Sequence, residues 1–355
     1  MALNIRTTKA VVVVELKVAA VREVLFPVLR DDWVLVKVKA VAINPTDWKH
    51  IDLGAADIGC RIGVDYAGIV EEVGKNVTNF VKGDRITGWT HGQNRVNHEC
   101  GAFAEYAVAK ACVQRKIPDN LSFEEAASLG VAIMTAGQGI YKNLELRLPT
   151  EPTKEPFPLF IYGGSTATGM AAIQLAKLSG LTVITTCSPH NFDLVKSLGA
   201  DAVFDYNSPT CGADIKELTK NRLTFAFDCT GDGARICAYA MSDTEPGTYG
   251  GIMPADYEFL KATNPKVHCQ DFLRGYDTMG EDYYWIAEEA VSPDPAGMEF
   301  YKFFLGLTQP LLENGSVKPL PMDLNRHGSG LDGVLMGLDE LKKGKVSGVK
   351  LVYTI

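Results

Sequence analysis

A run of glycine and hydroxyl residues, GGSTATG at positions 163–169, is the stretch of this sequence best suited to bind a phosphate group. Residues 159–162 before it form an apolar run typical of a buried parallel strand. Residues 170–178 after it are almost entirely apolar, as in a helix packed against a sheet. A strand, a glycine turn and a helix in this order bring unpaired N–H groups of the helix N-terminus close to a pyrophosphate. We therefore predict a dinucleotide-binding turn here.

The turn departs from the strict G-x-G-x-x-G pattern, which would need glycine where Thr166 stands. On this stretch alone, a tight turn without a ligand is the alternative. The sequence that follows favours a binding site, because residues 181–187 form a second strand where a βαβ unit returns to its sheet.

The end of this second strand bears on which dinucleotide binds. NAD-specific sites place a carboxylate there for the ribose 2′-hydroxyl, but this strand ends in Cys187 and Ser188 and continues through Pro189 to Asn191. Asp193 falls later, inside the next predicted helix. Because neutral donors do not repel a 2′-phosphate, we predict NADPH in preference to NADH.

Lys49 is a candidate for direct chemistry. It follows a valine-rich strand at residues 33–43 and the turn residues Asn44 and Pro45, and it stands close to Asp47. A surface charge is the default interpretation. Its position just past a strand end also leaves open a contact with cofactor or substrate.

Two kinds of element must position these residues. Residues 8–24, 33–43 and 101–108 are predicted β-strands of an antiparallel, barrel-like module. A capping pattern at residues 122–125 starts a helix, and residues 131–141 continue as a helical connection. From residue 159 to 253 strands and helices alternate, which is typical of a doubly wound parallel sheet. The terminal strand, within residues 342–353, is expected to return to the first module.

Composition narrows the possible partners. The chain has 355 residues, a net charge of −8, 46% hydrophobic and 22% charged residues. This acidic balance argues against nucleic acid or an anionic membrane as the main partner. No apolar run is long enough to span a bilayer and no signal-peptide pattern is present, so we expect a cytoplasmic protein. The eight cysteines are scattered without a C-x-x-C pair, which indicates reduced thiols.

Several motifs together resemble the medium-chain dehydrogenase/reductase superfamily over nearly the whole chain. They are NPTD at 44–47, GVDYAG at 63–68, GAFAEY at 101–106, YGGSTATG at 162–169 and the terminal G-K-x-x-G-x-K-L-V at 344–352. The resemblance implies an α/β fold: a Rossmann doubly wound parallel sheet in residues 131–306, plus a GroES-like β-barrel catalytic domain in residues 1–130 and 307–355.

Within this superfamily the chain is most similar to the fungal trans-acting enoyl reductases that serve iterative polyketide synthases. The resemblance rests on STAT at 165–168, SPHNFDL at 188–194, Asp205 with Tyr206, and KGKVSG at 343–348. It implies hydride transfer from NADPH to the C=C bond of an α,β-unsaturated thioester on an acyl carrier domain, with the resulting enolate stabilised and protonated at Cα.

The zinc-dependent members of the superfamily differ from this chain. They carry Cys or His in the strand-end motif, a His where Val64 stands, and a four-cysteine lobe that is absent here. His91, His98 and Cys100 lack the spacing of a tetrahedral site. We therefore predict no metal, and hydride transfer without a Lewis acid.

The resemblance also implies site residues. The cofactor contacts would be Thr46, Asp47, Trp48, Lys49, Gly163, Gly164, Ser165, Thr166, Ala167, Thr168, Ser188, Pro189, His190, Asn191, Tyr206, Ile252, Met253, Val346 and Ser347. The acyl site would be lined by Val131, Ala132, Ile133, Met134, Thr135, Ala136, Gly137, Gln138, Phe272, Leu273, Arg274, Gly275 and Tyr276. Lys49 is the candidate catalytic or positioning residue. No residue stands out as the proton donor, which leaves solvent.

Two other functions stay open: a free-standing NADPH-dependent reductase of quinones or alkenals, and an NADPH-binding sensor or scaffold without turnover. A transient contact with a carrier domain would need a local basic patch. Lys342, Lys343, Lys345 and Lys350 form one candidate, although a solvated charged tail is the more ordinary interpretation. Residues 267–271 are polar for an edge strand that pairs with another subunit, so we expect a monomer.

Overall fold

The computed structural model describes residues 6–285 and 289–355. Within these residues one sheet is entirely parallel, with six strands in the order β10-β9-β8-β11-β12-β13. Its strands are β8 (Pro158–Tyr162), β9 (Thr182–Cys187), β10 (Ala202–Asp205), β11 (Phe225–Asp228), β12 (Gly247–Gly251) and β13 (Val267–Cys269). Helices α4 (Ala167–Leu178), α5 (Phe192–Ser197), α6 (Cys211–Leu218), α7 (Ala234–Ala240) and α8 (Tyr257–Thr263) connect them. The predicted doubly wound sheet is confirmed.

A second sheet is mixed and contains most of the strands from the N-terminal third of the chain. Its path is β14-β15-β3-β4-β5-β7, and β6 pairs with β3. These strands are β3 (Trp33–Ala42), β4 (Asp65–Val73), β5 (Arg85–Trp89), β6 (Tyr106–Lys110), β7 (Gln114–Lys116), β14 (Met322–Leu324) and β15 (Lys350–Thr354). The hairpin β1 (Thr7–Glu15) and β2 (Val18–Leu25) forms a sheet of its own. The C-terminal strand β15 pairs antiparallel with β3, so it returns to the first module as predicted.

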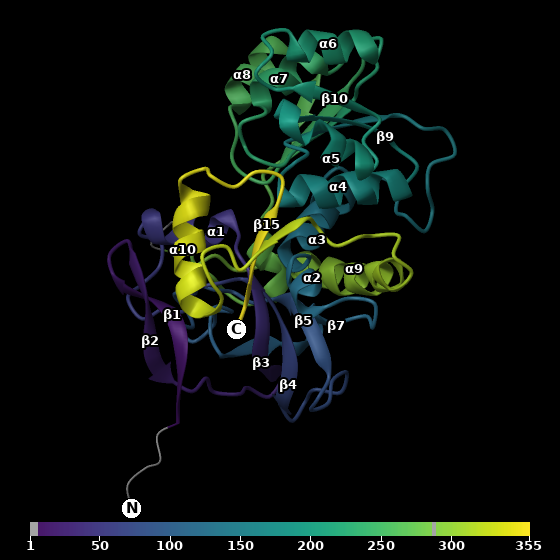
Figure 1. Ribbon diagram of the computed structural model, residues 1–355. Helices are drawn as coiled ribbons and strands as arrows, with labels where there is room; N and C mark the ends of the chain where they lie inside the picture. The colour runs from purple at the N-terminus through teal and green to yellow at the C-terminus, as the bar shows by residue number, and fades with distance from the viewer. Residues whose placement is uncertain (1–5, 286–288) are drawn as a thin grey trace, which may run out of the picture.

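The remaining helices join the two sheets. They are α1 (Pro45–Asp52), α2 (Phe123–Ala127), α3 (Gly130–Gly137), α9 (Pro295–Glu313) and α10 (Gly330–Lys342), with short 3-10 helices at Ala111–Val113, Pro189–Asn191 and Gly275–Met279 and a π-helical turn at Gln138–Asn143. Figure 1 shows the parallel sheet with α4–α8 at the top, β1–β4 at the bottom, and α10 beside α1. α9 runs across position 306, where the sequence-based division of the chain was drawn.

Some predicted boundaries are wrong. Residues 101–105 are not a strand: β6 begins at Tyr106, and before it Phe103 accepts a hydrogen bond from the Val11 N–H while Ala102 donates one to Gly63. Their backbone bonds go to β1, to the segment before β4 and, through the Glu105 carbonyl, to Val38 of β3, so no continuous ladder forms. The predicted helix cap is present: Ser122 caps α2 and accepts a hydrogen bond from the Glu125 N–H.

None of the described helices is long and apolar enough to cross a membrane.

The largest apolar cluster fills the space between α3, α4 and the parallel sheet, with Ile133, Met170, Ile173, Leu159 and Phe227 almost completely buried. All eight cysteines lie in the described part of the chain and are free thiols, six of them buried, as their scatter predicted. The core therefore fixes the glycine turn between β8 and α4 by packing on both sides.

Candidate active site

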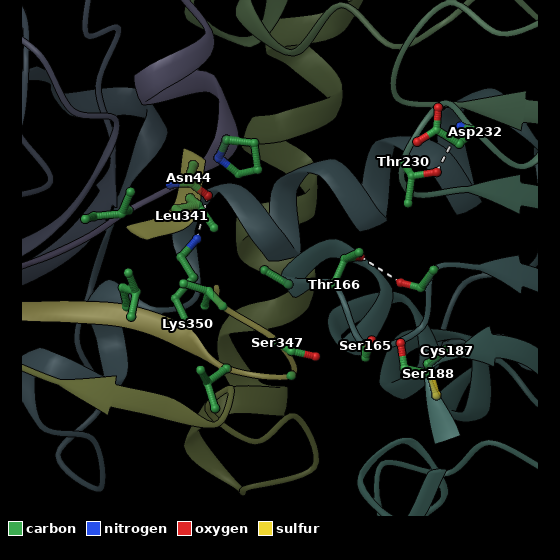
Figure 2. Close-up of a pocket in the computed structure, with 18 of the residues that line it drawn as sticks. Asn44, Ser165, Thr166, Cys187, Ser188, Thr230, Asp232, Leu341, Ser347 and Lys350 are labelled. Carbon is green, nitrogen blue, oxygen red and sulfur yellow. Dashed lines mark hydrogen bonds between the residues drawn. The ribbon is translucent and has the colours of Figure 1, made fainter. Parts of the chain in front are cut away.

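A cavity of about 390 Å³ opens where the parallel sheet meets the C-terminal segment that leads into β15. Figure 2 shows Ser165, Cys187 and Ser188 gathered on one side of it, and Asn44, Leu341 and Lys350 on the other. The first side belongs to the turns at the ends of the parallel sheet, and the second belongs to the mixed sheet and α10. A ligand here would therefore contact both halves of the fold.

The glycine turn forms one wall of the cavity. Gly163 has a positive φ of 81°, and a Cβ on Gly164 would lie 2.1 Å from Thr185 Oγ1. Thr166 caps α4: its Oγ1 accepts from the Gly169 N–H at 3.0 Å and donates to the Gly163 carbonyl at 2.8 Å. The turn thus keeps the N-terminus of α4 at the cavity, where the helix dipole favours a negative charge.

Hydroxyl groups mark the ends of β9 and β10. Ser188 and Tyr206 both line the cavity, and their hydroxyl oxygens lie 3.2 Å apart. The neighbouring carboxylate of Asp205 accepts hydrogen bonds from the backbone and side chain of Asn207 and is not among the lining residues. The carboxylate that does line the cavity is Asp232, after β11, a position that the sequence prediction missed.

Ser347 joins the two halves at the rim. Its hydroxyl lies 2.9 Å from His190 Nε2 and accepts a hydrogen bond from Asn191 Nδ2 at 2.9 Å. His190 and Asn191 follow β9, whereas Ser347 precedes β15. These bonds hold the segment 346–349 across the cavity from the glycine turn.

A buried ion pair lies beneath the opposite wall. Lys350 Nζ donates to Asp65 Oδ2 at 2.9 Å and to Asn44 Oδ1. Asp65 also accepts from Asn44 Nδ2 at 2.9 Å and, through its other oxygen, from the Val131 N–H at 2.7 Å. Both charged side chains are almost fully buried, so each depends on the other for charge compensation. Lys350 is therefore not part of a surface patch, and the expectation that grouped it with Lys342, Lys343 and Lys345 is wrong.

A second buried carboxyl, Asp47, lies next to this pair and has no cationic hydrogen-bond partner. Its Oδ2 accepts from the Asn44 N–H at 2.7 Å, while its Oδ1 has no partner among the described residues. Burial, with a smaller contribution from the negative charge of Asp65, raises the pKa of Asp47 to about 8. The carboxyl is mostly protonated at neutral pH.

The other residues of α1 face elsewhere. Lys49 is half-buried, with its ammonium 5.9 Å from the Trp48 ring, and it is not among the residues that line the cavity. Thr46 Oγ1 lies 3.0 Å from His50 Nδ1 and 3.1 Å from the Tyr276 hydroxyl.

Tyr276 belongs to an aromatic cluster that no spacing pattern in the sequence predicts. Its ring stacks on His91 with centroids 4.0 Å apart, and it contacts the rings of Trp89, Tyr283 and Trp285. Burial lowers the pKa of His91 to about 3 and lowers that of His50 as well, so both imidazoles are neutral at pH 7. The cluster joins segments separated by almost two hundred residues.

The two predicted acyl segments meet each other. Thr278 Oγ1 lies 3.5 Å from Met134 Sδ, and Met134 Cε would be 3.5 Å from a Cβ on Gly275. Much of α3, including Ala132, Ile133 and Ala136, is buried in the core. Neither segment is among the residues that line the cavity.

Two family models match this chain, one in each half of the fold. Residues 30–119 match the alcohol dehydrogenase GroES-like domain, and residues 167–249 match the zinc-binding dehydrogenase domain. Trans-enoyl reductase ACTTS2 of Alternaria alternata is 41% identical over 98% of this chain and 99% of its own length. The chain belongs to the trans-enoyl reductases. Trans-enoyl reductase TOXD of Cochliobolus carbonum is 55% identical over 64% of this chain and 77% of its own length.

The fold of this trans-enoyl reductase is that of the wider superfamily. An alcohol dehydrogenase superfamily protein from Novosphingobium aromaticivorans superposes with a TM-score of 0.79, covering 98% of this chain and 100% of the other, at 21% identity. The predicted combination of a Rossmann sheet and a GroES-like domain is therefore confirmed.

The cavity of the trans-enoyl reductase includes only part of the predicted cofactor set. Its lining includes Gly163, Ser165, Thr166, Ala167, Ser188, Tyr206, Val346 and Ser347. Not among the lining residues are Thr46, Asp47, Trp48, Lys49, Gly164, Thr168, Pro189, His190, Asn191, Ile252 and Met253. Ile252 and Met253 follow β12, where the Ile252 N–H donates to the Asp228 carbonyl. Sequence reasoning missed Asn44, Thr230, Asp232 and Leu341, which also line the cavity.

The described residues of the trans-enoyl reductase include no group of three or more His, Cys, Asp or Glu side chains placed to hold a metal. His91 stacks on Tyr276, and His98 Nε2 lies 3.5 Å from Asp57. Val64 immediately precedes Asp65, whose carboxylate pairs with the Lys350 ammonium.

Proposed function

We propose that this trans-enoyl reductase uses NADPH to reduce the C=C bond of an α,β-unsaturated acyl thioester carried by the acyl carrier domain of an iterative polyketide synthase. Its relatives ACTTS2 and TOXD are trans-enoyl reductases by name. NADPH, when bound, would supply the hydride that adds to Cβ. The chain itself would bind the cofactor, orient the thioester and provide for protonation at Cα.

The single observation that carries the cofactor assignment is the end of β9. Ser188 and Tyr206 present hydroxyls at the cavity where an NAD-specific site would present a carboxylate. Gly163 to Thr166 and the N-terminus of α4 would hold the pyrophosphate. Ser347, fixed by His190 and Asn191, would close the cofactor in from the opposite side.

The reaction we propose needs no zinc. A bound cation would have to compete with the Lys350 ammonium, which already occupies the space between Asn44 and Asp65. Val64 offers no donor atom beside it. Charge in this part of the site is supplied by Lys350, and we keep Lys49 as a candidate positioning residue at the edge of the substrate.

We also propose that the enzyme works as a cytoplasmic monomer that meets its synthase transiently. The edge strand β13 supports the monomer, because His268 within it and Gln270 and Asp271 after it are polar for an edge that pairs with another subunit. We assign residues 1–130 and 307–355 to the catalytic domain and residues 131–306 to cofactor binding.

The test is oxidation of NADPH and of NADH with three substrates in parallel: a 2-enoyl pantetheine thioester, a simple quinone and a short alkenal. We expect turnover of the thioester with NADPH. Faster turnover of the quinone or alkenal would indicate a free-standing reductase. Binding of NADPH without turnover of any substrate, even with a carrier domain present, would indicate a sensor. Equal KM values for NADH and NADPH would refute the cofactor assignment.

A further inference from the structure

Asp232 is the one carboxylate among the described residues that line the cavity. Its side chain is exposed, and its carboxylate has no hydrogen-bond or ion-pair partner among the described residues. Its backbone N–H donates to Thr230 Oγ1 at 2.9 Å (Figure 2). The phosphates of a dinucleotide only accept hydrogen bonds, as a carboxylate does. A carboxylate in this cavity is therefore suited to meet a donor group of the ligand, and not its phosphates.

The loop that carries Asp232 is fixed by the buried carboxylate of Asp228. Asp228 Oδ1 accepts from the Thr230 N–H at 2.8 Å and from Thr230 Oγ1 at 2.9 Å. Asp228 Oδ2 accepts from the Gly233 N–H and from the Tyr249 hydroxyl, both at 2.7 Å. These bonds hold the chain on both sides of Asp232, so the fold itself brings this residue to the cavity.

Asp232 lies close to the hydroxyls that we propose for the 2′-phosphate. A Cβ on Gly233, the next residue, would lie 2.7 Å from Cγ of Tyr162. The Tyr162 ring contacts the Tyr206 ring edge to face, with centroids 6.4 Å apart. The Tyr206 hydroxyl lies 3.2 Å from Ser188 Oγ. One end of the cavity is therefore bounded by two aromatic rings, two hydroxyls and one carboxylate.

The adenine of a bound NADPH would lie at this end. Its base and its 2′-phosphate are attached to neighbouring carbons of one ribose, so a 2′-phosphate held by Ser188 and Tyr206 places the base beside them. The nicotinamide would lie beyond the pyrophosphate, toward the side where Figure 2 shows Asn44 and Lys350.

Two donors of this half of the cofactor could reach a carboxylate: the ribose 3′-hydroxyl and the 6-amino group of adenine. The 3′-hydroxyl is attached beside the 2′-phosphate, where a second negative charge is repelled. The 6-amino group is on the far edge of the base and is the donor most distant from the phosphates. It is therefore the better partner for Asp232.

We propose that Asp232 selects the adenine base of the cofactor by accepting a hydrogen bond from its 6-amino group. This assignment rests on the proposed use of NADPH. Hypoxanthine carries an oxygen in place of the amino group, and that oxygen would face the carboxylate as a second acceptor. The hydroxyls of Ser188 and Tyr206 can donate or accept, so they fit either base. At this end of the cavity only Asp232 distinguishes the two.

The experiment measures binding without any thioester. The Kd values of NADPH and of its analogue, reduced nicotinamide hypoxanthine dinucleotide phosphate, are obtained from nucleotide fluorescence. The proteins are wild type, Asp232→Asn, Asp232→Ala and the matched control Asp205→Asn. The control also removes one negative charge, but Asp205 does not line the cavity, and asparagine keeps an oxygen for the bonds from Asn207.

Wild type is expected to bind NADPH about tenfold or more tightly than the hypoxanthine analogue, because the analogue loses a hydrogen bond to a charged acceptor. Both Asp232 variants should bring the ratio of the two Kd values to within about threefold of one, and the control should keep the wild-type ratio. A general effect of charge would change both Kd values alike and leave their ratio unchanged.

The assignment is overturned if wild type binds the two nucleotides equally, if Asp232→Asn keeps the wild-type ratio, or if Asp205→Asn lowers it as much. Failure of the proposed cofactor gives a different result, in which wild type binds NADH but not NADPH. The same comparison made with NADH and its hypoxanthine analogue then decides the role of Asp232. If wild type binds none of these nucleotides, both the cofactor and the role of Asp232 are refuted.

Discussion

The two buried aspartates beneath the cavity should respond in opposite ways to replacement by asparagine. Asp47 and Asp65 are both fully buried, but only Asp65 is paired with a lysine. The pKa of Asp47 is raised from 3.8 to about 8, mainly by burial. Between these values the unfolded chain is ionised while the folded chain keeps its proton. The folded state therefore loses stability as the pH rises from about 4 to about 8, and the loss is constant above that.

The size of this loss follows from the shift. At pH 7 the solution is about 3 pH units above the unfolded pKa of Asp47, and each unit corresponds to about 1.4 kcal/mol. Ionisation of Asp47 in the unfolded chain therefore lowers the free energy of unfolding by on the order of 4 kcal/mol. Asp47→Asn removes this cost and keeps an oxygen for the Asn44 N–H. We expect the variant to equal or exceed wild type at pH 8, and to lose this advantage at pH 5.

Asp65→Asn is the contrasting variant. It leaves the Lys350 ammonium buried without its partner, and removal of one member of a buried pair costs about 3–5 kcal/mol. The assay is reversible urea unfolding of wild type and both variants at pH 5 and pH 8. The reasoning is refuted if Asp47→Asn shows the same change in unfolding free energy between the two pH values as wild type, or if Asp65→Asn is as stable as Asp47→Asn.

Three further predictions concern the cavity. Ser188→Asp should raise the KM for NADPH about tenfold or more, because a carboxylate repels the 2′-phosphate, while the KM for NADH falls or stays unchanged. If the ratio of the two KM values does not change, Ser188 does not determine cofactor specificity. Gly164→Ala should lower unfolding free energy by about 1–3 kcal/mol and weaken NADPH binding, because its Cβ would lie 2.1 Å from Thr185 Oγ1. The control Gly306→Ala, in α9 with no atom within 4 Å of the added Cβ, should raise the free energy of unfolding by roughly 0.5–1 kcal/mol in the same urea unfolding assay. Dialysis against EDTA should leave the rate of thioester reduction unchanged. Loss of activity after dialysis that is reversed by adding Zn²⁺ would contradict the zinc-free site.

The parallel sheet could be predicted because its signals are local. Residues 159–162 are a buried apolar run followed at once by glycines, and the strand and α4 appear where these residues put them. The strand expected at 101–108 failed for the opposite reason. Alternation and β-propensity hold for residues 106–110. Residues 101–105 instead divide their backbone bonds among β1, β3 and the segment before β4, which sequence periodicity does not encode.

The residues themselves predicted the site only where they are close together in sequence. Gly163, Ser165 to Ala167, and Ser188 with Tyr206 lie within one βαβαβ unit, and they do line the cavity. Val346 and Ser347 line it too, but they were predicted only from the family resemblance. The cluster of His50, His91 and Tyr276 is built from three distant segments, none of which carries a spacing pattern. Contacts of that kind arise from tertiary packing, and a single sequence does not contain them.

Lys350 shows how a charge in sequence can be misjudged. It follows Lys342, Lys343 and Lys345, and such a run ordinarily lies in solvent. Those three are about half exposed, but Lys350 is the first residue of β15, and pairing of β15 with β3 carries it inward to Asp65 and Asn44. Its ammonium ties the C-terminal strand to the ends of β3 and β4 and, through Asp65, to the first turn of α3. The same C-terminal segment carries Ser347 to the rim of the cavity. The buried ion pair of Lys350 with Asp65 anchors the start of β15, and His190 and Asn191 bond to Ser347 itself. Together they hold Ser347 across the cavity from the glycine turn.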